Sequence, residues 1–140
     1  MSRLLAVRRR YANHETLLFR ALIGPLERLR GLLGTHADAA PVALVRCASI
    51  HTWGMGYRID VAFVDESGLV MEVWRAVVPG RVITVRGAWV TLERPALEGP
   101  WLARGERVHM SWMEDVRHAE RSENGAEGWN EVYVCGNAGA

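Results

Sequence analysis

The sequence contains no lysine, so all 17 of its basic residues are arginine. Arginine suits bidentate contacts with carboxylate or phosphate, but the codon bias of a GC-rich genome also accounts for such a set, and we prefer that interpretation. Two cysteines, Cys47 and Cys135, are too few for a disulfide framework, so we expect free thiols in a reducing compartment.

No apolar run reaches the roughly 18 residues of a membrane-spanning helix. The run at residues 4–7 is too short for a signal peptide. We therefore expect a cytoplasmic protein with no membrane span.

A strong net charge is also missing, because the whole chain carries only +1. This balance gives no overall attraction to nucleic acid, and we expect no nucleic-acid partner. The charge is unevenly spread: residues 1–30 hold seven Arg against two Glu, whereas residues 114–140 hold six acidic residues against two Arg. We predict a single β-rich domain over residues 1–113, followed by an acidic, flexible tail over residues 114–140.

Hydrophobic residues make up 49% of the 140 residues, which is enough for one core. After Pro41 apolar residues recur with a period of two, as expected for half-buried strands. Short strands separated by turns predict a mainly β fold, a small barrel or jelly-roll-like sandwich of antiparallel strands. The strands are expected at residues 4–11 (an edge strand), 42–47, 59–64, 69–74, 81–86, 88–94 and 108–112, with a hairpin turn at 65–68.

Residues 14–33 are the predicted helical segment. Leu18, Leu22, Leu26 and Leu29 recur at spacings of three and four, as one face of a helix requires. Pro25 interrupts this run and fits the first turn of a second helix better than the interior of one long helix. Gly31 and Gly34 follow at positions suited to ending it.

Several short motifs occur in a fixed order along the chain: RLRGLLG at residues 28–34, HTWGM at 51–55, IDVAFVD at 59–65, GLV at 68–70, Pro79, GA at 87–88 and LE at 92–93. This ordered set resembles the bacterial family called domain of unknown function 192. The resemblance covers roughly residues 28–110 and implies a compact all-β core with one helical excursion. It implies no activity, since the family has no established one. Leu97, Glu98 and Glu106 depart from the family pattern.

His51 is the leading candidate for chemistry, because we expect it in a turn with Thr52 and Met55, where functional side chains are common. Asp60 is the second, since it is flanked by apolar residues and needs a cation if it is buried. The nearby cations in the sequence are Arg46, Arg58 and Arg81. We prefer a structural role for both residues: His51 would fix its loop through a hydrogen bond, and Asp60 would stabilise the fold in a buried ion pair. The alternative is that Asp60 orients a catalytic His51.

Other motifs give weaker signals. The Cys47–His51 spacing lacks the second ligand pair of a structural zinc site, so no metal is expected, and no cofactor motif is present. Trp74 and Trp89 fall on the non-core phase of their predicted strands and would form a binding face if that side is open.

Three classes of function remain open. The first is a non-enzymatic module that binds a small polar or carbohydrate-like ligand. The second is a hydrolase-type enzyme that uses His51 and Asp60, and the third is a protein-interaction module that uses either terminus. The catalytic constellations are incomplete, so the binding module is our working hypothesis. The sequence indicates neither the ligand nor the oligomeric state.

Overall fold

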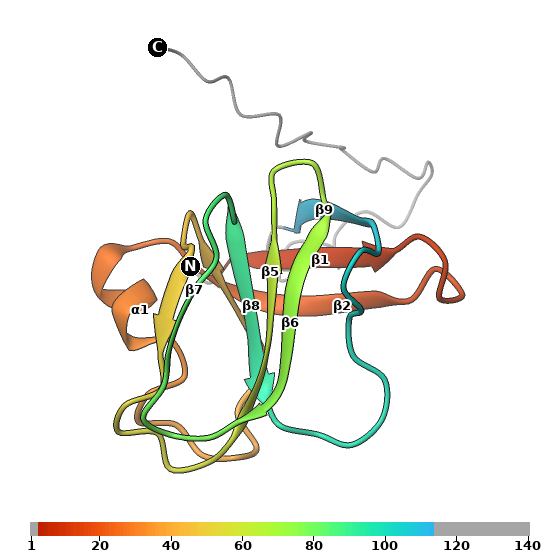
Figure 1. Cartoon of the computed structure of the whole chain (residues 1–140). Helices are drawn as coiled ribbons and strands as arrows, with labels where there is room; N and C mark the ends of the chain where they lie inside the picture. The colour runs from red at the N-terminus through yellow and green to blue at the C-terminus, as the bar shows by residue number, and fades with distance from the viewer. Residues whose placement is uncertain (1–2, 114–140) are drawn as a thin grey trace, which may run out of the picture.

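The computed structural model describes residues 3–113, which form nine β-strands and one short helix (Figure 1). The mainly β prediction is therefore confirmed. The predicted acidic tail at residues 114–140 lies outside the described residues. The elements in chain order are β1 (Leu4–Arg9), β2 (Thr16–Leu22), α1 (Pro25–Arg30), β3 (Val42–Val45), β4 (Ser49–His51), β5 (Ile59–Val64), β6 (Val70–Val77), β7 (Val82–Thr84), β8 (Val90–Pro95) and β9 (Val108–Met113).

Seven strands form one sheet in the order β6-β5-β8-β3-β2-β1-β9, and β4 pairs with β7 in a second, two-stranded sheet. All pairings are antiparallel except β2 with β3, which is parallel. The large sheet coils strongly, so that β1 and β2 run across the direction of β5, β6 and β8 (Figure 1). Its two edges approach at one end, where Leu69 and Arg107 form an isolated bridge. The sheet is sandwich-like and not a closed barrel.

The central strands β3, β5 and β8 are covered on both faces, and two apolar clusters result. Every residue of β3 and β5 is buried. The first cluster fills the inside of the coiled sheet and includes Leu5, Phe19, Val64, Leu92 and Trp101. The second lies on the opposite face, beneath α1 and the β4–β7 sheet, and includes Leu32, Leu44, Ile50, Val61 and Phe63. Asp60, Thr91 and Glu93 on these central strands are therefore buried, although they do not all point the same way.

The predicted helix over residues 14–33 is wrong in its first half, because residues 16–22 form strand β2. Here the hydrogen bonds to β1 and β3 outweigh the leucine periodicity. Leu18 of this periodic set is 47% exposed, whereas Phe19 and Leu22 are buried. The helix that does form begins at Pro25 and ends at the positive-φ Gly31, as the sequence indicated. The strand predicted at the sheet edge, β1, instead lies between β2 and β9.

Candidate functional site

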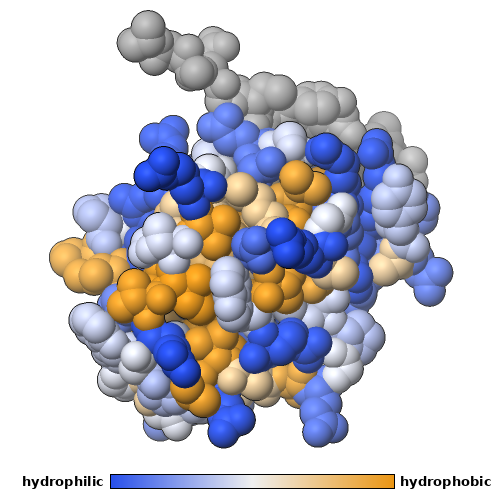
Figure 2. Space-filling model, viewed as in Figure 1, coloured by the Kyte–Doolittle hydropathy of each residue, from blue (hydrophilic) through white to orange (hydrophobic). Residues whose placement is uncertain are grey.

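A cavity of about 240 Å³ lies on the second-cluster face of the sheet, and we call it the α1 cavity. It is bounded by α1 and the residues that follow it, by β3 and β4 with the bend between them, and by β8. Figure 2 shows apolar surface on the α1 side of the molecule and across the middle of the view. α1 buries none of its own residues. The polar side chains that line the cavity are Arg28, Arg30, Cys47, Ser49, His51 and Glu93.

Glu93 is the most unusual of these side chains. It lies on β8 between Val42 of β3 and Val61 of β5, and only 3% of it is exposed. Within residues 3–113 no arginine or histidine forms an ion pair with it. Burial raises the pKa of Glu93 to about 7, although the backbone N–H of Leu32 hydrogen-bonds to the carboxyl group and opposes this shift. Near neutral pH the group can therefore either donate or accept a hydrogen bond.

Two further polar atoms of the α1 cavity are buried without a hydrogen-bond partner in the described part of the chain, Nε of Arg28 and Nδ1 of His51. Nη1 of Arg28 donates to the carbonyl oxygens of Val45 (3.2 Å) and Arg46 (2.9 Å), which fixes the guanidinium against the end of β3. Unsatisfied buried polar atoms are rare in folded proteins and cost free energy. Arg28 and His51 thus each carry an unsatisfied polar atom beside the cavity that Glu93 also lines.

Cys47 also lines the α1 cavity, but its surroundings favour the neutral thiol. Burial raises the pKa of the thiol, and Sγ donates a hydrogen bond to the carbonyl oxygen of Ser49 at 3.1 Å. A reactive cysteine needs the opposite shift, toward the thiolate. Cys47 is thus not activated as a nucleophile.

The residues predicted around His51 are only partly brought together. His51 and Met55 line the α1 cavity, and Met55 is buried in the second cluster. Thr52 is buried: its Oγ1 donates to the carbonyl oxygen of Val78 and accepts from the backbone N–H of Arg81, both at 2.8 Å. It therefore holds the β6–β7 connection in place.

Arg46 and Arg81 do not line the α1 cavity, and both are exposed. Arg81 contributes only its backbone to the contacts of Thr52. Arg46 has a positive φ of 54° and offers its carbonyl oxygen to Arg28.

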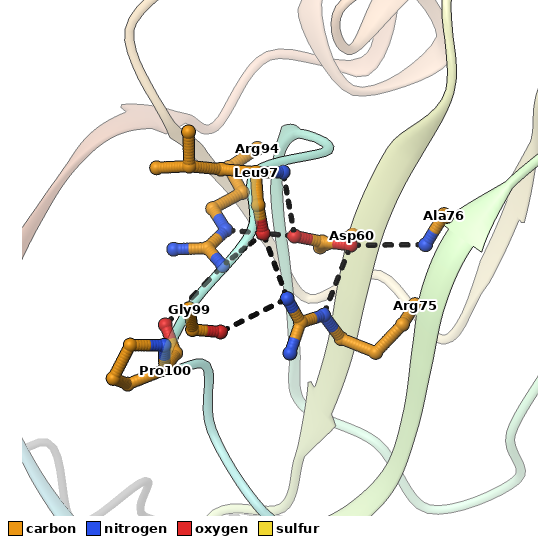
Figure 3. A network of polar contacts seen from close by, with 7 residues as sticks. All are labelled: Asp60, Arg75, Ala76, Arg94, Leu97, Gly99 and Pro100. Atoms are coloured by element: carbon orange, nitrogen blue, oxygen red, sulfur yellow. Dashed lines mark hydrogen bonds and ion pairs between the residues drawn. The ribbon is translucent and has the colours of Figure 1, made fainter.

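Asp60 points to the opposite face of β5 and is only 1% exposed. It lies directly across from Arg94 of β8 at a bulge in the pairing of β5 with β6, and both carboxylate oxygens are occupied (Figure 3). Oδ2 accepts from Nε of Arg94 at 2.9 Å, and Oδ1 accepts from the backbone N–H of Ala76 at 2.9 Å. Arg75 adds an ion pair at 3.1 Å, and the backbone N–H of Leu97 donates at 3.3 Å.

Burial acts to raise the pKa of Asp60, but the hydrogen bonds from Ala76, Arg94, Leu97 and Arg75 outweigh it and hold the pKa below its usual range. Asp60 thus forms a buried ion pair, as we preferred, but its partners are Arg94 and Arg75 in place of the nearby cations proposed from the sequence. It does not orient His51, which lines the cavity on the other face.

Trp74 and Trp89 do not share a face. Trp74 packs edge-on against Phe63 in the second cluster, with ring centroids 5.7 Å apart, whereas Trp89 packs against the first cluster. Both are half-buried. Trp53 does not line the cavity; it is 60% exposed, and its ring centroid lies 5.8 Å from that of His51.

Sequence reasoning missed Glu93 and Arg28. Glu93 was given no role, since it shares the strand phase of Trp89, opposite Val90 and Leu92. The available signal was the unbroken run of β-formers at residues 90–92, which is typical of a strand that is covered on both faces. Arg28 gave no signal, because its role depends on contacts with the distant β3.

Comparison with known proteins identifies the fold only. No family model and no curated protein sequence matches the chain. The resemblance to domain of unknown function 192 therefore stays a prediction. A proposed transcription regulator from Sinorhizobium meliloti 1021 has a similar structure, with a TM-score of 0.61 and 17% identity over 79% of this chain and 94% of that one. A protein of unknown function from Novosphingobium aromaticivorans DSM 12444 has a TM-score of 0.56 and 18% identity, over 76% of this chain and 83% of that one.

The described residues contain neither a cluster suited to a metal ion nor a membrane-spanning helix. Within residues 3–113 no group of three or more His, Cys, Asp and Glu side chains is placed to hold a metal ion. In the same part of the chain no helix is long and apolar enough to cross a bilayer.

Proposed function

We propose that this protein is a non-enzymatic module that binds a small polar, carbohydrate-like ligand in the α1 cavity. The observation that carries the proposal is the buried Glu93 carboxyl group, which lines the cavity without a cationic partner within residues 3–113. A ligand group that shares a hydrogen bond with this carboxyl would offset part of its burial cost.

The other unsatisfied atoms describe the ligand further. Nε of Arg28 is a donor, so it would pair with an acceptor oxygen of the ligand. Nδ1 of His51 can donate or accept a hydrogen bond according to its tautomer. Neighbouring hydroxyl groups satisfy both kinds of atom, since each hydroxyl donates and accepts. The cavity volume of about 240 Å³ lies below the roughly 300–1,000 Å³ of sites for drug-sized molecules, which favours a ligand about as large as one sugar ring.

Binding is favoured over catalysis because the cavity lacks an activated nucleophile. Cys47 is held as a thiol, and Asp60 is engaged on the other face. Within the described residues no carboxylate hydrogen-bonds to Nδ1 of His51, so the imidazole is not held in one tautomer as a catalytic base would be.

The test is a titration of the full-length chain with a panel of monosaccharides and small polyols. Binding is measured by the change in NMR chemical shifts and by the change in Tm on thermal unfolding. We expect one class of compound to bind saturably and to raise Tm. Glu93→Gln and His51→Ala should weaken that binding by about tenfold or more, as expected for loss of a buried hydrogen bond. Glu98→Gln, a matched change on an exposed loop residue, should leave it unchanged. Failure of the whole panel to bind at millimolar concentration, or equal binding by Glu93→Gln and wild type, would contradict the proposal.

A further inference from the structure

A second concave site lies on the other side of the fold and shares no lining residue with the α1 cavity. It has a volume of about 590 Å³ and is lined by Arg8, Arg9, Arg10, His14, Ser67 and Arg107, together with the start of β9. We call it the arginine cleft. Its walls come from the end of β1, the β1–β2 turn, the β5–β6 turn and the segment before β9.

The walls of the arginine cleft are fixed by backbone contacts. The N–H of Val108 donates to the carbonyl oxygen of Gly68 at 2.8 Å, and the N–H of Arg10 donates to that of Arg107 at 3.3 Å. Gly68 has a φ of +85°, and a Cβ there would lie 2.1 Å from the carbonyl oxygen of Val108. The β5–β6 turn therefore sits directly on the strand that carries the opposite wall.

The positive charge of the cleft is only partly balanced. Nε and Nη2 of Arg9 donate to the two carboxylate oxygens of Glu106 at 2.9 and 2.8 Å, and Arg9 also forms an ion pair with Glu15. Glu106 and Glu15 are thus paired with Arg9, while Asp65 of the β5–β6 turn is near enough to Arg107 for the positive charge to lower the pKa of its carboxyl. Within residues 3–113 none of the ion pairs involves Arg8, Arg10 or Arg107. Three exposed guanidinium groups thus share one concave site.

His14 lies at a position that the backbone disfavours. The N–H of Glu15 donates to the carbonyl oxygen of Ala12 at 2.9 Å, and the two central residues of this turn, Asn13 and His14, have φ values of 49° and 53°. Two positive values define a type I′ turn, whose second central position favours glycine. His14 adopts a φ value that histidine disfavours, and its side chain lines a cleft of arginines. A strained residue at such a place is consistent with a binding role.

We propose that the arginine cleft binds a small molecule that carries a phosphate or diphosphate group. Guanidinium groups bind phosphate through paired, charge-assisted hydrogen bonds. Several such groups around one cavity match a compact, multiply charged anion better than a single carboxylate. A continuous nucleic-acid backbone fits less well, because Glu15 and Glu106 flank Arg9 and would repel neighbouring phosphates. This proposal is independent of the ligand in the α1 cavity.

The test is isothermal titration of the full-length chain at low ionic strength with pyrophosphate, AMP and a single-stranded oligonucleotide. The cleft variant is Arg8→Gln with Arg10→Gln. The matched control is Arg58→Gln with Arg86→Gln, which removes the same charge from exposed arginines outside the cleft. We expect pyrophosphate or AMP to bind saturably, about tenfold or more weaker in the cleft variant and within about twofold of wild type in the control.

Three results would overturn the proposal: no saturable binding of either small phosphate, equal weakening in the two double variants, or binding of the oligonucleotide alone. Circular dichroism of each variant establishes that it is folded. Should the Arg8/Arg10 variant fail to fold, Arg107→Gln from the opposite wall, measured against Arg86→Gln, gives the same comparison.

Discussion

Replacing Glu93 with Gln removes the buried carboxyl group of the α1 cavity, while the side chain keeps its shape and its ability to accept the Leu32 hydrogen bond. The pKa of Glu93 is raised from 4.5 to about 7 in the folded chain. A raised carboxyl pKa means that the folded state binds the proton more tightly than the unfolded state does. Its contribution to stability is therefore fully present below the unfolded pKa and is lost as pH rises through the folded pKa.

The size of the effect follows from the shift. Wild type should lose about 1.4 kcal/mol per pH unit, relative to the Gln variant, between the unfolded and folded pKa values. Above pH 7 the loss levels off at about 3 kcal/mol, an order-of-magnitude figure that corresponds to roughly 10 °C in Tm for a chain of this size. Glu93→Gln should thus be more stable than wild type at pH 8 and about as stable at pH 4.

The assay is urea unfolding of both proteins across this pH range, with Glu98→Gln as a control whose difference from wild type should not vary with pH. A flat difference for Glu93→Gln would refute the reasoning. So would a wild type that is the more stable protein at pH 8, because the carboxylate would then have a partner that the structure does not show.

Three further predictions concern other parts of the fold. Asp60→Asn should lower the free energy of unfolding by about 3 kcal/mol in urea titrations, because it leaves the partly buried Arg94 without its counter-ion; a loss below about 1 kcal/mol would contradict this. Gly68→Ala should cost more than about 2 kcal/mol, since its Cβ would meet the carbonyl oxygen of Val108, and a Tm equal to that of wild type would exclude such contact. His14→Gly should raise the free energy of unfolding by about 1 kcal/mol, because glycine adopts the positive φ without strain, while it weakens pyrophosphate binding; a fall in both stability and binding would show that the turn does not hold strain.

The parts of the fold that local sequence determines were predictable. β5 was predicted with the bounds that it has, because its alternation is bracketed by clear turns. The turn after it forms as expected, with Asp65 accepting hydrogen bonds from Ser67 and Leu69. β2 was missed because its leucine spacing also fits a helix, and only the pairing with β1 and β3 decides between the two.

The candidate site was less predictable, because burial on both faces of the central strands depends on tertiary structure. His51 does lie at a cavity, and Asp60 does form a buried ion pair. The partners of Asp60 could not be read from neighbouring positions, since Arg94 is 34 residues away and lies opposite it only through the register of β5 and β8. Glu93 could not be recognised as buried until α1 and the β4–β7 sheet were known to cover its face.

The two buried carboxyl groups of the central sheet lie one register position apart on paired strands, and they point to opposite faces. Asp60 has two arginines and two backbone N–H groups, and its pKa is held low. Glu93 has one backbone N–H, and burial raises its pKa to about 7. The same two strands thus supply Asp60 with full hydrogen bonding and leave Glu93 with an uncompensated desolvation cost. A fold can retain such a cost when the group serves binding, which is why we propose Glu93, and not the better-connected Asp60, as the binding group of the central sheet.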